Sequence, residues 1–336
     1  MSIVERDNRI DALKGVLISL VVLGHCLLWG GQKSSVANWI YLFHMPFFVF
    51  LSGYLSHANS RSYWKSVLAI VESYVVFQLI KGILSGYSPI AFLTTPAAMM
   101  WYLFALVIWR CLYYLWDIII KHATEKQRNN LNILVAVVLI GLGLAVGLFC
   151  QVGKTFALSR IIVFLPFFWL GTMAQKFDFI GFCKKIPRWM AILILIITLS
   201  FIIWLTPQGW LNVRETVRCV NCYEILGGTK IGLAGRAIYY FMAIVISIAL
   251  TNLIFENKII CRIGKDSLKY YLFHGVILLF MSYFNVPWTW WLSIIYFVIL
   301  MVSMYFFNMT KLSDFAIRPF HFIKNTITTR KINNNG

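Results

Sequence analysis

The sequence has little charge and very few acidic residues. Only 12% of its 336 residues are charged, and the 12 Asp and Glu accompany 30 Lys and Arg, giving a formal net charge of +18. No dense set of carboxylates for ion coupling is present, and Gly-Gly-Thr-Lys at 227–230 lacks the spacing of a phosphate-binding loop. A small-residue cleavage site is also missing after the first apolar run, which predicts an uncleaved first span.

What the sequence does have is apolar surface. Hydrophobic residues make up 60% of the chain, including 27 Phe and 13 Trp, which is more than a soluble domain can bury. We therefore predict an all-α integral membrane protein of about ten transmembrane helices, forming one polytopic domain over 1–323, with a short basic tail over 324–336 that is disordered. The expected spans are 12–30, 39–55, 67–84, 101–120, 132–150, 161–175, 189–205, 237–255, 268–284 and 288–307. The proline-interrupted segment 85–100 either dips into the membrane or lies on its surface.

The positions of the basic residues predict how the chain is oriented. With the N-terminus inside, 21 of the 30 Lys and Arg fall in cytosolic segments and 7 in outer ones. Cytosolic loops of membrane proteins collect Lys and Arg, so both termini are expected in the cytosol. The same rule accounts for the basic charge without a nucleic-acid partner.

One outer loop, 206–236, is long and carries both Arg and Glu side chains. It is either a solvated connection or a rim that handles a polar ligand. Cys219 and Cys222 in this loop are spaced as a strained disulfide, which we favour, or as a redox pair, or without any role. A zinc site would need a second pair of ligands, so no metal site is predicted. Cys150 is expected to be a small apolar residue of a span.

The stretch from Arg9 to His25 carries ionisable groups at the start of a span. Lys14 and His25 are 11 positions apart, about three helical turns, so both lie on one face roughly 16 Å apart. With Lys14 at the cytosolic boundary, His25 lies in the middle or outer half of the membrane. An ionisable residue there is either functional or a buried histidine bonded to a neighbouring helix.

A second histidine, His44, is expected in the outer half at a depth compatible with His25. Pro46 should bend its helix, and Ser52 with Gly53 should permit close helix packing. The alternative is a kinked packing helix with one satisfied histidine.

Further polar residues lie on later spans. Ser267, Tyr271 and His274 follow a helical period and form one stripe, with His274 expected in the inner half. Arg160 opens a span at the outer side. Two charges lie in the middle of spans and should face inward, pair or contact water: Glu72 and Arg110.

Several motifs follow one another along the chain. They are a basic residue ten positions before His (Lys14, His25), F-H-M-P-F-F-V-F-L-S-G-Y at 43–54, W-Y-L-F-A-L from Trp101, F-L-P-F-F-x-x-G at 164–171 and I-G-K-x-S-L-x-Y-x-L-F-H at 263–274. In this order they resemble membrane acyltransferase family 3, especially its fucose 4-O-acetylase-like branch, from Arg9 to about Gly275.

Two features depart from that family. Lys14 stands where many members have Arg, which keeps the charge but loses the bidentate fork. The region 61–72 holds only Arg61 and Lys65 where many members have an Arg-rich run, so a donor-binding role is not carried over to it.

The resemblance implies O-acylation of a carbohydrate hydroxyl by cytosolic acetyl-CoA, with no bound cofactor, in the bacterial cytoplasmic membrane. It makes His25 the general base, with Lys14 and Asp11 on the donor side. The glycan acceptor is expected to contact a further set of residues: His44, Arg160, Ser267, Tyr271 and His274. Composition alone favours a glycan transporter or flippase, and a non-catalytic partner of an envelope-synthesis complex is the third hypothesis.

Overall fold

A computed structural model of the protein describes residues 7–29, 34–58, 62–153, 155–209, 211–284 and 286–323, and this part of the chain is helical with no β-strand. Within it, nine helical segments are long and apolar enough to cross a membrane: α1 Asn8–Leu28, α2 Ser35–Tyr54, α3 Tyr63–Leu84, α5 Trp101–Ile119, α6 Glu125–Ala145 with its continuation to Leu148, α7 Leu158–Ala174 with the turn before it from Thr155, α9 Arg188–Gln208, α11 Thr229–Leu253 and α14 Trp290–Phe307. The predicted all-α membrane class is confirmed.

The remaining expected span, 268–284, corresponds to α13, Ser267–Tyr283. Its 17 residues are at the short end of the lengths that cross a bilayer. Shorter helices connect the long ones: α4 Pro89–Thr94, α8 Phe179–Lys184, α10 Val213–Arg218, α12 Lys258–Lys265 and α15 Lys311–Ile317. The tail 324–336 lies outside the described residues, and the cytosolic placement of the termini stays a prediction.

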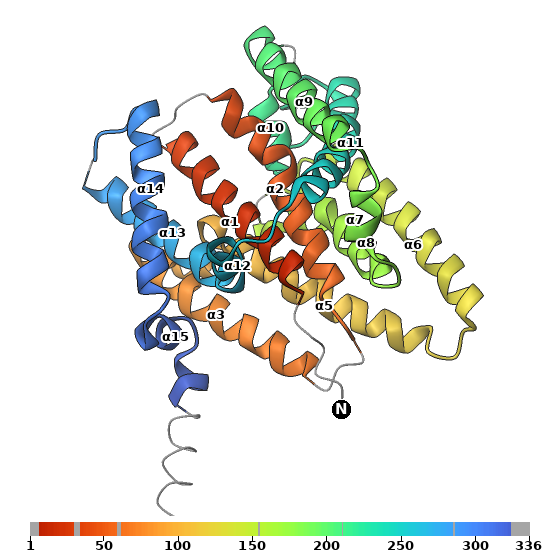
Figure 1. Ribbon diagram of the computed structural model, residues 1–336, viewed down its shortest axis with the longest axis horizontal. Coiled ribbons are helices and arrows are strands. Elements are labelled where there is room, and N and C mark those ends of the chain that lie inside the picture. The colour runs from red at the N-terminus through yellow and green to blue at the C-terminus, as the bar shows by residue number, and fades with distance from the viewer. Residues whose placement is uncertain are drawn as a thin grey trace, which may run out of the picture.

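The two N-terminal helices form the centre of the molecule. α1 packs against α2, α12, α13 and α14, and α2 packs against α7, α9 and α11. Most residues of α1 and α2 are buried, whereas α6, α9 and α14 lie at the periphery and expose apolar side chains (Figure 1). Side chains cap both central helices: Asp7 accepts from the N–H of Arg9, and Ser34 accepts from that of Ala37.

A glycine contact brings α2 and α7 together. A Cβ atom on Gly53 would lie 2.0 Å from the carbonyl oxygen of Phe168, and one on Gly171 would lie 2.0 Å from that of Phe50. Only glycine permits this approach of two backbones, which confirms the close packing predicted at Ser52 and Gly53. α2 continues through Pro46 as a single helix. The contact fixes the position of Arg160 on α7 relative to His44 on α2.

The connection between α3 and α5 is anchored by one buried side chain. The Gln78 amide nitrogen donates to the carbonyl oxygens of Phe92 and Thr95, and its oxygen accepts from the N–H of Ala97. No residue of α4 is fully buried, and the chain then turns inward so that Met99 and Met100 are buried. Segment 85–100 therefore combines a partly exposed helix with a buried return.

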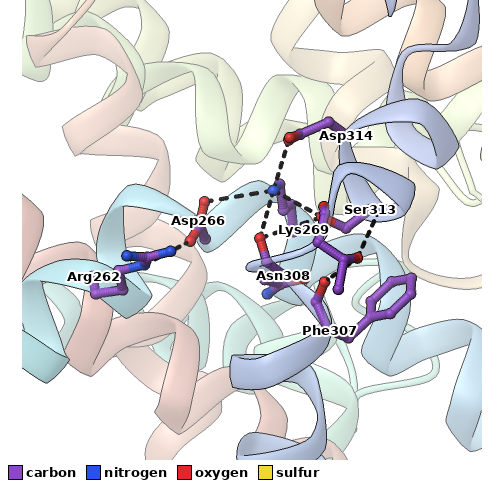
Figure 2. Close-up of polar contacts among 8 residues, drawn as sticks. Arg262, Asp266, Lys269, Phe307, Asn308, Ser313 and Asp314 are labelled. Carbon is purple, nitrogen blue, oxygen red and sulfur yellow. Dashed lines mark hydrogen bonds and ion pairs between the residues drawn. The ribbon is translucent and has the colours of Figure 1, made fainter.

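Two opposite ends of the molecule carry different polar structures. α10 lies beside the first half of α2, while α12 and α15 lie toward the other end (Figure 1). Near α15, the Nζ of Lys269 contacts Asp314, Ser313 and the carbonyl oxygen of Asn308, and Asp266 lies 3.9 Å away (Figure 2). This network ties the start of α13 to the C-terminal helix.

The two mid-span charges do not pair with each other. Arg110 donates to the hydroxyls of Ser56 and Ser66 and lies 5.1 Å from the ring centroid of Tyr63. Glu72 accepts from the backbone N–H groups of residues 320 and 321. Both charges are used to hold neighbouring segments in place.

Candidate active site

α1 and α2 bring two of the predicted histidines together through a tyrosine. The hydroxyl of Tyr41 lies 2.7 Å from the Nδ1 of His25, and the rings of Tyr41 and His44 are 4.6 Å apart between centroids. His44 uses its Nδ1 to donate to the carbonyl oxygen of Ile40, at 2.8 Å, so its Nε2 is the acceptor nitrogen of the ring. The predicted common depth of His25 and His44 is confirmed.

The third histidine, His274, meets them. Its ring centroid lies 5.3 Å from that of His25, and its Nδ1 donates to the carbonyl oxygen of Tyr270 at 2.7 Å. Its Nε2 is buried and has no hydrogen-bond partner in the described part of the chain. The expectation that His274 is staggered in depth from His25 is therefore wrong.

The reason is the position of α12. A Cβ on Gly264 would lie 1.7 Å from the carbonyl oxygen of Asp11, so α12 packs directly on the first turns of α1. α13 consequently begins at the level of Ile18, which lines a cavity together with Ser267. His274 follows Ser267 by seven residues, and His25 follows Ile18 by seven, which is about 10 Å of helix in each case. Because the two helices start this count at the same level, the two histidines meet.

A cavity of about 300 Å³ opens beside His25. Four of the predicted site residues line it, namely His25, His44, Arg160 and Tyr271. The other lining residues were not predicted as site residues, and they are Leu28, Trp29, Tyr41, Met45, Met99, Trp101, Phe164, Arg214, Val217 and Arg218. We call this space the histidine cavity.

A second cavity of about 170 Å³ adjoins the first. Ser267 and Ile18 line its far end, and Met45 and Tyr271 line both cavities, so the two meet at this pair. Its walls are mostly apolar, and Val21 of α1 is among them. We call it the apolar cavity. Predicted site residue Ser267 thus belongs to it and not to the histidine cavity.

Lys14 and Asp11 lie beyond the apolar cavity. The Nζ of Lys14 is 3.0 Å from a carboxylate oxygen of Asp11, whose side chain is nearly fully buried. One face of α1 carries Lys14, then Ile18 and Val21 on the apolar cavity, then His25. The structure therefore separates the predicted catalytic set into a charged pair at one end of α1 and a histidine about 16 Å further along.

Three arginines face the histidine cavity, of which sequence analysis selected one. Arg160 of α7 lies with its guanidinium 4.9 Å from the ring centroid of Trp101, and its Nε donates to the carbonyl oxygen of Arg218 at 3.0 Å. Arg214 and Arg218 come from α10. Their spacing of four residues, which places two cations on one helical face, was the signal in the sequence that could have found them.

A buried lysine behind the histidines was also missed. Lys81 of α3 is fully buried, and its Nζ has no hydrogen-bond partner among the described residues. It lies against α13, where a Cβ on Gly275 would be 2.5 Å from the lysine nitrogen. An unsatisfied donor, Lys81 Nζ, and an unsatisfied acceptor, His274 Nε2, therefore lie on facing helices. The signal was a lysine inside an apolar span.

The disulfide differs from the predicted one. Cys222 pairs with Cys150, 72 residues earlier, and Cys219 is a free, buried thiol whose pKa is raised by burial. Cys150 lies past the end of α6 and is exposed, so its placement inside a span was also wrong. The backbone turns at Cys219 (φ 54°) after α10 and points this residue inward, while Cys222 faces Cys150.

The histidine cavity has the groups needed to move a proton. Nε2 of His25 is a free acceptor if Nδ1 carries the ring hydrogen and donates it to the Tyr41 oxygen. A hydroxyl bound in this cavity could then give its proton to Nε2. The adjoining arginines can stabilise negative charge next to this base.

Comparisons with known proteins indicate the family of the chain. A family model described as an acyltransferase domain matches residues 7–310. Two proteins named Nodulation protein NolL, from Mesorhizobium japonicum and Sinorhizobium fredii, are each 45% identical over 58 residues, which is 15% of this chain and 16% of theirs. The match thus spans about a sixth of the length of these relatives. No solved structure matches the chain.

Proposed function

The chain belongs to acyltransferase family 3, and from this premise we propose that it transfers an acetyl group from acetyl-CoA to a hydroxyl of a cell-surface polysaccharide or its lipid-linked precursor. The observation that carries this proposal is a pair of neighbouring cavities along α1 that share Met45 and Tyr271. The apolar cavity lies on the Lys14 side of His25, and the histidine cavity is lined by His25 and His44, with His274 next to His25. This arrangement would allow a donor and an acceptor to reach one base from opposite sides.

The reaction follows from the position of His25. The acceptor hydroxyl gives its proton to Nε2 while its oxygen attacks the thioester carbonyl. The tetrahedral intermediate then collapses, the carbon–sulfur bond breaks, and the proton on His25 passes to the departing thiolate of CoA. General-base help of this kind contributes typically about 10²–10⁴ in rate. In the required tautomer the Nδ1 of His25 donates to the Tyr41 oxygen, 2.7 Å away, and Nε2 accepts the proton.

The donor side is assigned to Lys14. The acyl arm of CoA ends in the thioester, and the apolar cavity, which Ile18 and Val21 line, lies along α1 between Lys14 and His25. The cation of Lys14 at the far end would contact the anionic part of the donor. Asp11 orients that ammonium through their 3.0 Å ion pair.

The orientation in the membrane has two supports. The excess of basic residues favours a cytosolic position for the Lys14 end, on the side where acetyl-CoA is made. The Cys150–Cys222 disulfide lies at the other end, beside the loop that carries α10, and disulfides persist in oxidising compartments. The glycan would therefore enter from the outer face of the bacterial cytoplasmic membrane.

Membranes that contain the protein, acetyl-CoA labelled in its acetyl group and a surface glycan test the proposal. We expect label to appear in the glycan. Movement of glycan across the membrane without acetylation would support the transporter. If every surface glycan of the producing cell is neither moved nor acetylated, a non-catalytic partner is supported. A comparison of the surface glycans of cells that produce the protein with those of cells that lack its gene identifies the acceptor to use.

Replacing Lys14 tests the donor side. Lys14→Arg keeps the cation, so the variant should stay active, whereas Lys14→Ala should raise the KM for acetyl-CoA or abolish its binding. Binding of acetyl-CoA to the purified variants is the measurement. Normal binding by Lys14→Ala together with lost binding by His25→Ala would reverse the two assigned roles.

A further inference from the structure

The histidine cavity has an unusual balance of charge at its outer rim. Arg160, Arg214 and Arg218 line it, and no Asp or Glu does so within the described part of the chain. Arg218 is partly neutralised, because it lies 2.9 Å from Glu215. Arg160 and Arg214 form no ion pair among the described residues. The cavity therefore presents net positive charge to whatever enters it.

Arg214 is the clearest member of the three. Its Nε is buried and has no hydrogen-bond partner in the described residues. The Arg214 side chain as a whole is half-buried, but a buried guanidinium nitrogen without an acceptor is costly, and a bound anion would supply that acceptor. Arg160 is held in place, since Trp101 lies under its guanidinium and its Nε donates to the Arg218 carbonyl oxygen. Two cations thus face one space beside His25.

The anionic donor is a poor explanation for these arginines. Lys14 and the apolar cavity lie on the opposite side of the Met45–Tyr271 junction, and the arginines come from α7 and α10 at the other end. A donor whose thioester stops at His25 would leave this rim unoccupied. The cavity of about 300 Å³ is at the lower end of the range for small-molecule sites, so it fits the end of a glycan.

We infer that the acceptor is an anionic glycan, with a carboxylate or phosphate close to the hydroxyl that is acetylated, held by Arg160 and Arg214. This inference rests on the proposed function for its reaction. The arginine fork matches the oxygens of either anion bidentately. Binding the anion would hold the neighbouring hydroxyl beside His25 and exclude neutral glycans from the productive position.

Binding to the purified protein in detergent tests the inference without needing acetyl transfer. The probes are a disaccharide that contains glucuronic acid, the same disaccharide with its carboxyl group reduced to an alcohol, and glucosyl phosphate. We expect at least one acidic probe to bind roughly tenfold or more tightly than the reduced one, because hydrogen bonds to charged groups are the stronger ones. The tighter of the two acidic probes identifies the source of the anion.

Two substitutions assign the effect to the cavity. Arg214→Gln should remove most of the preference for the acidic probe, and Arg214→Lys should restore part of it by returning the charge. Lys230→Gln is the matched control, because Lys230 lies at the start of α11, is exposed and does not line the cavity. It should bind all probes as the unchanged protein does.

Three results would overturn the inference. They are equal binding of acidic and reduced probes, no binding of any probe at millimolar concentration, and equal effects of Arg214→Gln and Lys230→Gln. Displacement of the acidic probe by CoA through Arg214 would assign the arginines to the donor instead and also overturn it. A protein that binds acidic glycans through Arg214 but acetylates none would contradict the proposed function and leave the anionic ligand standing.

Discussion

Two buried lysines of this protein have opposite surroundings. Lys269 on α13 contacts the carbonyl oxygen of Asn308 and the hydroxyl of Ser313 at 2.9 Å, and the carboxylate of Asp314 at 2.7 Å (Figure 2). Lys81 on α3 is fully buried and has no hydrogen-bond partner among the described residues. Lys269 belongs to α13, and Lys81 lies against the same helix at Gly275.

The difference separates structural charge from charge at a site. Lys269 joins α13 to α15, and its partners compensate for the loss of water, so it holds two segments together. The Nζ of Lys81 and the Nε of Arg214 are buried without a hydrogen-bond partner in the described residues, and both residues lie around the histidines. Such residues lower stability, and they are expected where function requires them. The comparison thus predicts which substitutions change activity and which change stability.

The largest expected effect is on catalysis at the histidine cavity. His25→Ala should lower acetyl transfer about 10²–10⁴-fold, because the base is lost, with normal protein abundance in the membrane. Tyr41→Phe removes only the group that orients the ring, so it should lower turnover less. The measurement is the rate of label transfer from acetyl-CoA. Near-normal turnover by His25→Ala would make His25 structural.

The disulfide should give the next largest effect, on stability. Cys150→Ser removes a link across 72 residues of chain that include α10, and such a loss costs typically about 2–4 kcal/mol. Thermal unfolding of the purified protein measures it. Cys222→Ser should cost the same, and the double variant should add nothing further. Mass spectrometry of unreduced peptides that joined Cys219 to Cys222 would contradict this pairing.

A smaller stability effect should separate Lys269 from a neighbouring exposed lysine. Lys269→Ala should lower the free energy of unfolding by about 2 kcal/mol, below the value for a fully buried pair because Asp314 is half exposed. Lys265→Ala is the control, since that side chain is exposed on the preceding helix. Equal unfolding temperatures for the two variants would show that the network in Figure 2 contributes nothing.

The smallest expected effect has the opposite sign. Lys81→Met replaces an unsatisfied buried donor with an apolar side chain of similar length, so the free energy of unfolding should rise by about 1–2 kcal/mol. Acetyl transfer should fall, because the cation beside His274 is gone. Lys65→Met, exposed on the same helix, is the control. A destabilised Lys81→Met would mean that the lysine is paired in the native protein.

The sequence by itself determined the helices and several members of the site. Long apolar runs specify membrane helices because a backbone in lipid must satisfy its own hydrogen bonds. Helical periodicity placed Lys14 and His25 on one face of α1, and the cost of burying a polar group marked His44, Arg160, Tyr271 and His274 as inward-facing. These inferences need only one helix at a time, which is why they could be made from the chain alone.

Only the tertiary structure decided at which point along its length each helix contacts its neighbour. α12 packs on α1 through Gly264, and this shift brings His274 level with His25. The partner of Cys222, the approach of α10 with Arg214, and the contact between Tyr41 and His25 depend likewise on loops and on two or more helices. Hydropathy and periodicity fix which face of a helix is buried, but the axial offset between helices is set by side-chain volumes at their contacts, which no single segment encodes.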